Sequence, residues 1–285
     1  MVAKTFVSDG SSYKQAKRIY ISTGTEWKDI KRAWVSDGSK WKLVFVRTLD
    51  LVISSDVQNY NIYNAATALY GTLTEPVNIN LLVMPNVIVG SSYTVTGSAW
   101  SRVQNPGQPA MVSGNFPSGS TIAITVSSGA YIVGHGGQGG SSGSPNGGGI
   151  RGTQWAGGDA LRVTVPTKIY NYGTIAGGGG GGAGGDGVGN NSIAGGGGAG
   201  YPGGLGGYGY SAVTGYAPSG TLTTGAINSG LGYPTWQAKG GDLGKPGQYG
   251  GNFNSTGQVG QAGAYVVGKE YVTWEVSGTR LGVAV

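Results

Sequence analysis

Glycine dominates the second half of this chain: fifty of the sixty glycines follow Val133, and residues 177–182 form an unbroken run. Glycine loses more backbone entropy on folding than any other residue and has no side chain to bury, so such runs form neither an α-helix nor an ordinary packed strand. A flexible linker is one interpretation. Large side chains interrupt the runs, however, and a solvated linker has no use for them, so we predict order. These side chains are Trp155, Tyr170, Tyr172, Ile175, Tyr201, Leu205, Tyr208, Tyr210 and Trp236.

Ordered glycine runs are expected to form extended left-handed helices with three residues per turn. Such helices have no internal hydrogen bonds, so neighbouring segments must satisfy their N–H and C=O groups. Without Cβ atoms the helices can approach closely and add Cα–H···O contacts. The strict three-residue repeat of collagen is missing. We therefore predict stacked polyglycine II helices in the runs 134–140, 177–189, 195–209, 240–251 and 257–263.

The first 47 residues contain three copies of a 14-residue repeat. Each copy has an Asp-Gly or Thr-Gly turn, at Gly10, Gly24 and Gly38, where glycine permits the positive φ of a hairpin turn. One aromatic residue precedes each turn and another follows it, so cross-strand aromatic pairs are expected. The pairs are Phe6 with Tyr13, Tyr20 with Trp27, and Trp34 with Trp41, followed by Lys14, Lys28 and Lys42 respectively.

Such hairpins are not stable alone, and about 40 residues make a marginal domain. Three hairpins related by pseudo-threefold symmetry could instead sit on the threefold axis of another protein. We therefore predict that residues 1–47 are an attachment module for a trimeric fibre or tail protein. Its packing residues would be Trp27, Trp34 and Trp41, surrounded by Lys14, Lys28 and Lys42. The alternative is a plain six-stranded meander whose aromatic residues form only its own core.

The positive net charge of +6 is concentrated in these hairpins. Residues 1–47 hold ten Lys and Arg against four Asp and Glu, whereas the remainder is balanced at eight and eight. A basic segment is typical of nucleic-acid binding, but the repeat explains these residues without it, so we expect no nucleic-acid partner. The absence of cysteine excludes disulfides and thiolate metal sites. No apolar run is long enough for a membrane helix and the N-terminus lacks a signal-peptide core, so we expect no membrane insertion, and assembly in a cytoplasm.

The rest of the chain divides by pattern into three parts. Residues 48–133 contain short apolar runs bounded by Gly, Pro, Asn or Ser, which predict a small β-domain, and only residues 57–70 could hold a short helix. Residues 134–263 are the glycine-rich domain, interrupted by strands, and residues 264–285 are strands expected to pack back on the β-domain. The predicted fold class is mainly β plus irregular structure, with N-terminal β-hairpin repeats, a small β-domain and a glycine-rich domain of stacked polyglycine II helices.

The sequence offers no enzyme. His135 is the only histidine, so no metal pair is available, and no Ser-His-Asp triad has support. We interpret His135 as a side chain that lies beside a glycine helix. The segment 134–140 resembles a dinucleotide fingerprint, but no βαβ unit follows it. One calcium-type motif at residues 185–189 carries little weight as a single copy. We predict no catalytic residue, no cofactor and no metal site.

The order of the glycine motifs resembles that of the adhesins at the tip of T-even-type phage long tail fibres. The resemblance is carried by Gly134-His-Gly-Gly-Gln-Gly-Gly, a Ser/Asn/Gly loop, Gly158-Asp-Ala-Leu-Arg-Val, and Tyr172-Gly-Thr-Ile-Ala followed by six glycines. The closing segment from Val276 to Val283 is also similar. The resemblance covers roughly residues 120–285, and the hairpin repeats and the larger middle domain depart from it.

This resemblance implies a sandwich of polyglycine II helices with receptor specificity in the joining loops, here 141–156, 186–194, 208–237 and 248–256. Loops rich in Tyr, Trp, Ser, Asn and Gly on a rigid scaffold also have the composition of a recognition surface. The expected partner is a bacterial outer-surface receptor, either an outer-membrane protein or a polysaccharide, and the expected location is the tail fibre or tail tip of a virion. The candidate receptor-binding residues are Trp155, Tyr208, Tyr210, Tyr216, Tyr233, Trp236, Tyr249 and Phe253.

Two other functions are compatible with a glycine-rich slab. A structural tail or baseplate protein would cap or space other parts without receptor contact, but it would not need aromatic loops. An ice-binding protein would require flat, regular Thr/Ala faces, which the irregular loops do not provide. The adhesin interpretation therefore explains the loop residues best.

Overall fold

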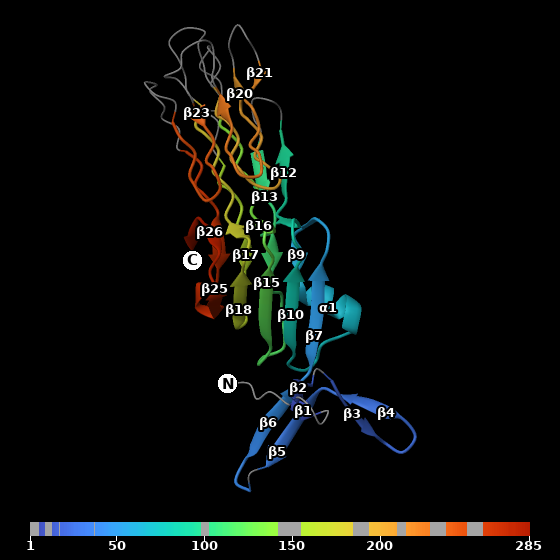
Figure 1. The fold of residues 1–285 in the computed structure, drawn as a ribbon. Coiled ribbons are helices and arrows are strands. Elements are labelled where there is room, and N and C mark those ends of the chain that lie inside the picture. Colours follow the sequence, from blue (N-terminus) through green and yellow to red (C-terminus); the bar gives the residue numbers. More distant parts are fainter. Residues whose placement is uncertain are drawn as a thin grey trace.

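The computed structural model describes residues 6–8, 13–16, 18–36, 38–97, 103–141, 155–184, 194–209, 215–228, 238–249 and 259–285. Within them the chain is mainly β, as predicted, with one α-helix, α1 (Ile62–Tyr70), and one 3-10 helix, η2 (Lys269–Tyr271). None of the helices in these ranges is long and apolar enough to cross a membrane. Figure 1 shows hairpins at one end, a β-solenoid in the middle and the glycine runs at the other end.

The N-terminal residues form three antiparallel hairpins, in each of which a strand pairs with the next strand along the chain. Gly24 and Gly38 lie in the turns of the second and third hairpins with φ of 90° and 89°. Their positive φ is the conformation that Asp-Gly and Thr-Gly turns permit. The strands are β1 (Phe6–Ser8), β2 (Tyr13–Gln15), β3 (Ile19–Ser22), β4 (Trp27–Ile30), β5 (Arg32–Ser36) and β6 (Trp41–Val46).

The aromatic residues of a hairpin are diagonal neighbours and do not lie directly opposite each other. In the second hairpin Tyr20 pairs with Asp29, and Trp27 pairs with Ser22. The two aromatic side chains therefore share one face of the hairpin with an offset of two residues, a distance that large rings can still span. The third hairpin repeats the same offset for its two tryptophans, since Trp34 pairs with Leu43 and Trp41 pairs with Ser36.

The middle of the molecule is a solenoid of parallel strands with three faces. Each coil contributes one strand to each of three five-stranded sheets, and there are five coils. Sheet 1 contains β7 (Thr48–Ile53), β10 (Asn78–Val83), β15 (Thr121–Val126), β18 (Thr167–Asn171) and β25 (Val272–Val276). Sheet 2 contains β8 (Val57–Gln58), β11 (Ile88–Gly90), β16 (Tyr131–Val133), β19 (Thr174–Ala176) and β26 (Thr279–Leu281). Sheet 3 contains β9 (Tyr60–Asn61), β14 (Met111–Val112), β17 (Leu161–Arg162), β24 (Ala264–Val267) and β27 (Val283–Ala284).

The solenoid crosses the boundaries that the sequence pattern suggested. The first two coils and the start of the third come from residues 48–133. The third coil closes with β17, and the fourth begins with β18 and β19, all inside the segment 134–263. In the segment 264–285, β24 closes the fourth coil and β25, β26 and β27 form the fifth. Strands inside the glycine-rich segment 134–263 therefore belong to the same sheets as those before and after it. This arrangement arises because the glycine runs leave the solenoid and return to it.

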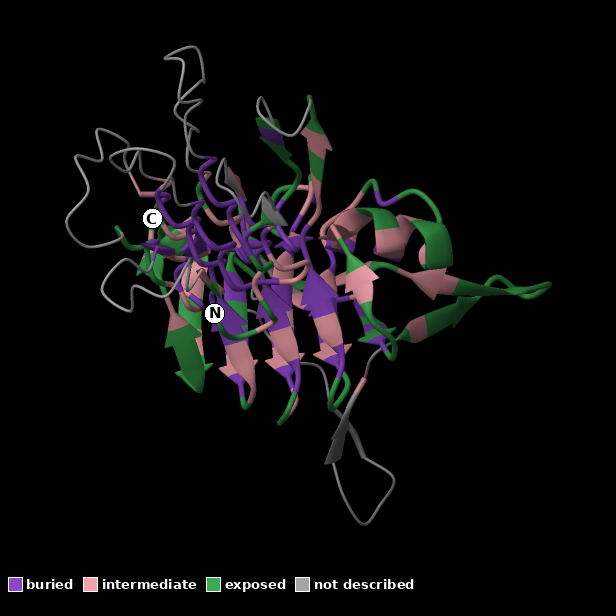
Figure 2. Cartoon of the chain, turned by 90° about the horizontal axis from the view of Figure 1, so that it is seen from above, coloured by how far each residue is buried: buried purple, intermediate pink, exposed green. Residues whose placement is uncertain are grey.

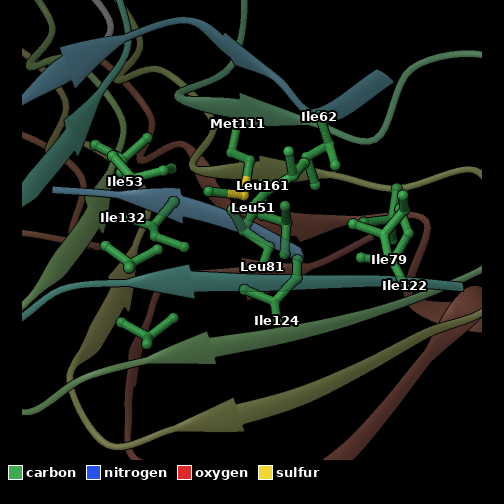
Figure 3. Packing of buried hydrophobic residues seen from close by; sticks show 14 of the residues in the cluster. Leu51, Ile53, Ile62, Ile79, Leu81, Met111, Ile122, Ile124, Ile132 and Leu161 are labelled. Carbon is green, nitrogen blue, oxygen red and sulfur yellow. The ribbon is translucent and has the colours of Figure 1, made fainter. Parts of the chain in front are cut away.

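The core lies inside the solenoid, where alternate residues of each strand point inward and stack on the coils above and below. In sheet 1 the register aligns Leu51, Leu81, Ile124 and Ile169, all buried. Sheets 2 and 3 contribute residues such as Ile132 and Leu161 from the other two sides (Figure 3). Figure 2 shows that burial continues from this core into the glycine runs. The period-two pattern of the sequence thus produces three inward faces.

The two ends of the solenoid are closed differently. The helix α1 packs on the first coil and buries Ile62 and Ala66, with the side chain of Asn61 accepting a bond from the Asn64 amide as its N-cap. In the last coil Arg280 pairs in register with Ile175, at a position where the other coils carry an apolar residue. Its guanidinium lies 4.6 Å from the centre of the Trp274 ring, a cation–π contact.

Contacts around Tyr70 join the hairpins to the solenoid. The Tyr70 ring lies 5.9 Å from the guanidinium carbon of Arg18 and 5.6 Å from that of Arg47. The Tyr70 hydroxyl donates to the carbonyl of Asp50 in β7. Arg32 also forms an ion pair with Glu75, in the segment that follows α1. Hairpin residues are therefore held against the α1 end of the solenoid.

Three coils extend outward at the same corner, between sheets 2 and 3. In coil 2 the chain leaves as a hairpin of β12 (Tyr93–Thr96) and β13 (Val103–Pro106). In coils 3 and 4 it leaves as glycine runs, and the coil 4 excursion carries two short strand pairs. These are β20 (Tyr208–Gly209) with β21 (Gly215–Tyr216), and β22 (Ile227–Asn228) with β23 (Ala238–Lys239). All of these excursions run away from the N-terminal hairpins (Figure 1).

Candidate functional site at the far end of the glycine array

Residues 177–183 form the centre of the glycine array, and from Gly178 onward their amides point to three neighbouring segments in rotation. Amides that lie three residues apart donate to the same segment, and none donates within its own run. A period of three is that of an extended three-residue helix bonded only to its neighbours. The six bonds are Gly178 to Gly158, Gly181 to Trp155, Gly179 to Ala199, Gly182 to Gly196, Gly180 to Lys245 and Ala183 to Gln248, each 2.8 to 3.2 Å long.

The carbonyls of the same run accept bonds from three further segments with the same period. Gly179 and Gly182 accept from Gly137 and Gly140, and the remaining carbonyls accept from residues 260–263 and 241–244. Six segments thus surround the central run. A Cβ added at any position from 177 to 182 would lie closer than 3.0 Å to a neighbouring backbone oxygen. The packing therefore requires glycine, for the same steric reason as the crowded axis of collagen.

The run 195–200 shows the same rotation with a different set of neighbours. Its amides donate in turn to the first glycine run, to the segment 238–241 and to the segment 218–221. The six bonds are Gly195 to Gly140, Gly198 to Gly137, Gly196 to Ala238, Ala199 to Gly241, Gly197 to Pro218 and Gly200 to Thr221. The pattern is consequently a property of the array as a whole.

Side chains replace a missing neighbour along one side of the first run. The amide of His135 donates to the Ser91 hydroxyl at 2.5 Å, and the amide of Gln138 donates to Oε1 of Gln104 at 2.6 Å. Nε2 of Gln104 donates to the Gly136 carbonyl at 3.1 Å and lies 3.0 Å from Nδ1 of His135. Because these donors and acceptors are three residues apart, Ser91 and Gln104 occupy the place that another glycine run would fill.

His135 is a buried structural side chain. Its ring fills the space beside Gly158, where a Cβ would clash with it. Nδ1 of His135 lies 3.0 Å from Nε2 of Gln104 and 3.1 Å from the Gly136 carbonyl, and Nε2 of His135 is buried without a partner among the described residues. Burial lowers the pKa of His135, and the backbone of Gly136 and the charge of Asp159 oppose the shift only in part. The ring also packs against the ring of Tyr93, with the ring centres 5.2 Å apart, which is the geometry of a packing group.

The residues at which the chain leaves the array lie at one level, which we call the rim. Hydrogen bonds join many of these residues directly. The predicted loop 208–237 returns to the array in its middle, because the Gly197 amide donates to Pro218 and the amides of Gly220 and Ala226 donate to Gly204 and Gly197. The bonds that connect the rim are Gly195 to Gly140, Gly182 to Gly196, Gly196 to Ala238, Gly207 to Gly195, Ala217 to Gly207, Ala183 to Gln248 and Gln248 to Lys239. Most of the predicted loop residues lie outside the described residues, namely 142–154, 186–193, 210–214, 229–237 and 250–256.

Tyr208 and Tyr216 come together at the rim. They pair across the antiparallel strands β20 and β21, and their ring centres lie 5.1 Å apart in an edge-to-face arrangement. The amide of Tyr208 donates to the Ser141 hydroxyl, which ties this strand pair to the first run. Tyr216 is 52% exposed, and Tyr249 is also exposed. These three aromatic residues therefore lie where the predicted loops begin.

Trp155 occupies a different setting from the other candidate residues. Its carbonyl accepts from Gly181 within the array, and its side chain is half-buried with Nε1 buried and without a partner among the described residues. Trp155 thus lies in the base of a loop. Of the remaining candidates, Tyr210, Tyr233, Trp236 and Phe253 lie outside the described residues.

Polar side chains at the edges of the array were not identified from the sequence. Asp242 accepts bonds from the Gly225 amide at 3.0 Å and from Nζ of Lys239 at 2.9 Å. Burial by itself raises the pKa of Asp242, but these two bonds and the Lys239 charge outweigh it and lower the pKa. The only signal was the position of Asp242 within a glycine run. No cluster of His, Cys, Asp and Glu in the described ranges could hold a metal ion.

The candidate attachment residues lie on the hairpins at the opposite end of the molecule from the rim (Figure 1). Trp27 and Trp41 are 73% and 70% exposed, and Trp34 is also exposed. Lys28 is exposed and forms an ion pair with Glu26 at 3.0 Å. The side chains of Lys14 and Lys42 lie outside what the structure describes. The described tryptophans therefore do not form a closed core of the hairpins.

A scaffold whose loop bases gather at one end is typical of proteins that bind through their loops. The model of a known family, the phage tail fibre adhesin Gp38, matches residues 48–285. The chain therefore belongs to the Gp38 family of phage tail fibre adhesins, as its resemblance in sequence indicated. This membership makes it a component of the tail fibre of a virion, in a family of adhesins rather than of enzymes.

A similar solved structure supports the same conclusion. It is described as the crystal structure of the gp37-gp38 adhesin tip complex of the bacteriophage S16 long tail fibre. The TM-score is 0.54 and the sequence identity is 26%, over 84% of this chain and 83% of that chain. Among curated proteins no match was found.

Proposed function

We propose that this protein is the tip adhesin of a phage tail fibre and binds a bacterial surface receptor through the loops that join polyglycine II helices. The receptor is an outer-membrane protein or a polysaccharide. The observation that carries this proposal is the three-residue rotation of hydrogen bonds in the run 178–183, which brings described loop bases together at one rim. An array fixed in this way holds its loops in place without constraining their sequence.

The aromatic residues of the rim support recognition by aromatic packing. Tyr208, Tyr216 and Tyr249 lie at the bases of loops, and the segment 208–237 contains no charged residue. Tyrosine and tryptophan provide large contact areas at a low cost in side-chain entropy. Binding should therefore depend weakly on salt and strongly on the presence of the rings.

We further propose that the N-terminal hairpins dock on a trimeric fibre or tail protein. Three similar hairpins at the end opposite the rim, with exposed Trp27, Trp34 and Trp41, support this arrangement. Residues 1–47 lie outside the range that the family model matches. Particles would be assembled in the host cytoplasm, and neither a cofactor nor a metal is required.

Receptor binding is tested by removing rings in the full-length protein. Tyr216→Ala and Trp236→Ala should each weaken adsorption to host cells by about 1–4 kcal/mol in binding free energy. Tyr172→Ala is a matched control, because Tyr172 is 56% exposed but lies on the solenoid away from the rim. Replacing loops 208–237 and 248–256 by those of a related adhesin should change the host range. Unchanged adsorption by all of these proteins would refute the proposal.

The second candidate function is a tail or baseplate capping protein without receptor contact. It makes the opposite forecast: loop variants should adsorb normally, and only particle assembly should depend on the chain. Attachment is tested by Trp27→Ala together with Trp41→Ala, and by deletion of residues 1–47, each followed by quantification of the protein in purified virions. Normal incorporation of these proteins would show that the hairpins are not the attachment site.

A further inference from the structure

The hairpin β12–β13 leaves the solenoid at the same corner as the glycine runs. The connection from sheet 2 to sheet 3 consists of Asn59 alone in coil 1 and of Gly282 alone in coil 5. In coils 3 and 4 that connection becomes the glycine array and ends in the rim loops. In coil 2 it becomes β12–β13, which runs in the same direction along the array (Figure 1). By position in the fold, this hairpin is the coil 2 counterpart of the glycine runs of coils 3 and 4, which end in the rim loops.

One face of the hairpin is built into the array. Gln104 is 1% exposed and bonds to His135, Gly136 and Gln138 of the first run. On the partner strand the Tyr93 hydroxyl donates to the carbonyl of Gly203 at 2.9 Å. The hairpin therefore cannot swing away from the array without breaking buried hydrogen bonds, and its position relative to the rim is fixed.

The other face of the hairpin is exposed and uncharged. Its residues alternate with the buried ones and comprise Thr94, Thr96, Val103 and Asn105, with Val103 39% exposed. Gln104 lies at the level of residues 136–138, so this face ends about one three-residue turn, or ~9 Å, short of Ser141 at the rim. The groups on this face are hydroxyl, amide and aliphatic. Like the segment 208–237, the face carries no charge.

We propose that the exposed face of β12–β13 contacts the same bacterial surface receptor as the rim loops, with Gln104 as the residue that positions it. This inference rests on the proposed receptor binding at the rim and adds a lateral contact to it. Its occupant is the receptor, because the hairpin shares its corner, direction and anchorage with the excursions that carry the rim.

The test uses the full-length protein, fluorescently labelled, and its binding to intact host cells. Val103→Asp and Thr94→Asp place a charge on the exposed face and should each weaken binding at least tenfold. Val52→Asp is the matched control: Val52 is also an exposed strand valine, 56% exposed on the outer face of sheet 1, and this variant should bind within twofold of the unaltered protein. Circular dichroism verifies folding, and Val103→Ser replaces any variant that fails to fold.

Tyr216→Ala separates the failure of this inference from the failure of receptor binding at the rim. If Tyr216→Ala weakens binding while Val103→Asp and Thr94→Asp do not, the hairpin contact is refuted and the rim function stands. If none of the three changes binding, both are refuted. An equal loss with Val52→Asp also refutes the hairpin contact, because the effect would then be one of added charge alone.

Discussion

The amide of Gly137 donates a hydrogen bond of 2.8 Å to the carbonyl of Gly179, so the excursions of two successive solenoid coils are bonded side by side. The next pair in the same direction is Gly140 with Gly182, three residues further along both runs. The two runs are therefore parallel and in register over a full turn. The packing leaves no volume for a side chain at Gly137, Gly179 or Gly182.

Gly179→Val should destabilise the protein strongly, by about 3 kcal/mol or more, because its Cβ would overlap the carbonyl of Gly241 and overpacking is costly. Gly71→Ala tests the other role of glycine: the space there is open but φ is 77°, so the cost should be only about 1–2 kcal/mol. Denaturant unfolding followed by circular dichroism measures both. Equal stability of Gly179→Val and the unaltered protein would contradict this packing.

Gln104→Leu should lower the free energy of unfolding by about 3 kcal/mol, because the Gln138 amide and the Gly136 carbonyl would lose their buried partner. Asn105→Leu alters the next, exposed residue of the same strand and should change stability by about 0.5 kcal/mol or less. Hydrogen exchange gives a local readout: the Gln138 amide should lose protection in Gln104→Leu alone. Retained protection of that amide would mean that another group satisfies it.

The stability of the protein should fall as the pH drops below about 6.5, the ordinary pKa of histidine. The pKa of buried His135 is lowered in the folded state, so the unfolded chain binds the proton first. The stability contributed by the neutral ring is complete above the unfolded pKa and is lost as the pH falls through the folded pKa. Denaturant midpoints between pH 8 and pH 5 should show a smaller loss in His135→Gln. Parallel pH profiles for the two proteins would exclude His135 as the cause.

Tyr70→Leu should loosen the N-terminal hairpins while leaving the solenoid folded. The variant removes the ring between Arg18 and Arg47, and each cation–π contact contributes about 0.5–1 kcal/mol at an exposed site. Hydrogen exchange of residues 19–46 should accelerate, whereas amides of the core strand β15 should not change. Tyr70→Phe keeps the ring and loses only the bond to Asp50. Hydrogen exchange of residues 19–46 in this variant should therefore be faster than in the unaltered protein and slower than in Tyr70→Leu.

Much of the local structure follows from short-range pattern. The 14-residue repeat places Gly24 and Gly38 in turns, and both have the positive φ that such turns need. The interpretation of His135 as a packing group agrees with its burial beside Gly158. The sequence pattern did not indicate that Leu51, Leu81, Ile124 and Ile169 form one stack through four coils. Parallel strands separated by long insertions leave no local signal of their order.

The sequence by itself determined the kind of backbone this protein can have: glycine runs exclude side-chain packing, and turn residues divide the remainder into short strands. Both are consequences of each residue's own steric freedom. Only the tertiary structure decided that the strands wind into one solenoid, that the excursions share a corner, and that Gln104 takes the place of a glycine run. Those relationships depend on hydrogen bonds between segments far apart in the chain, and a uniform glycine run carries no information about which neighbour will satisfy its N–H groups.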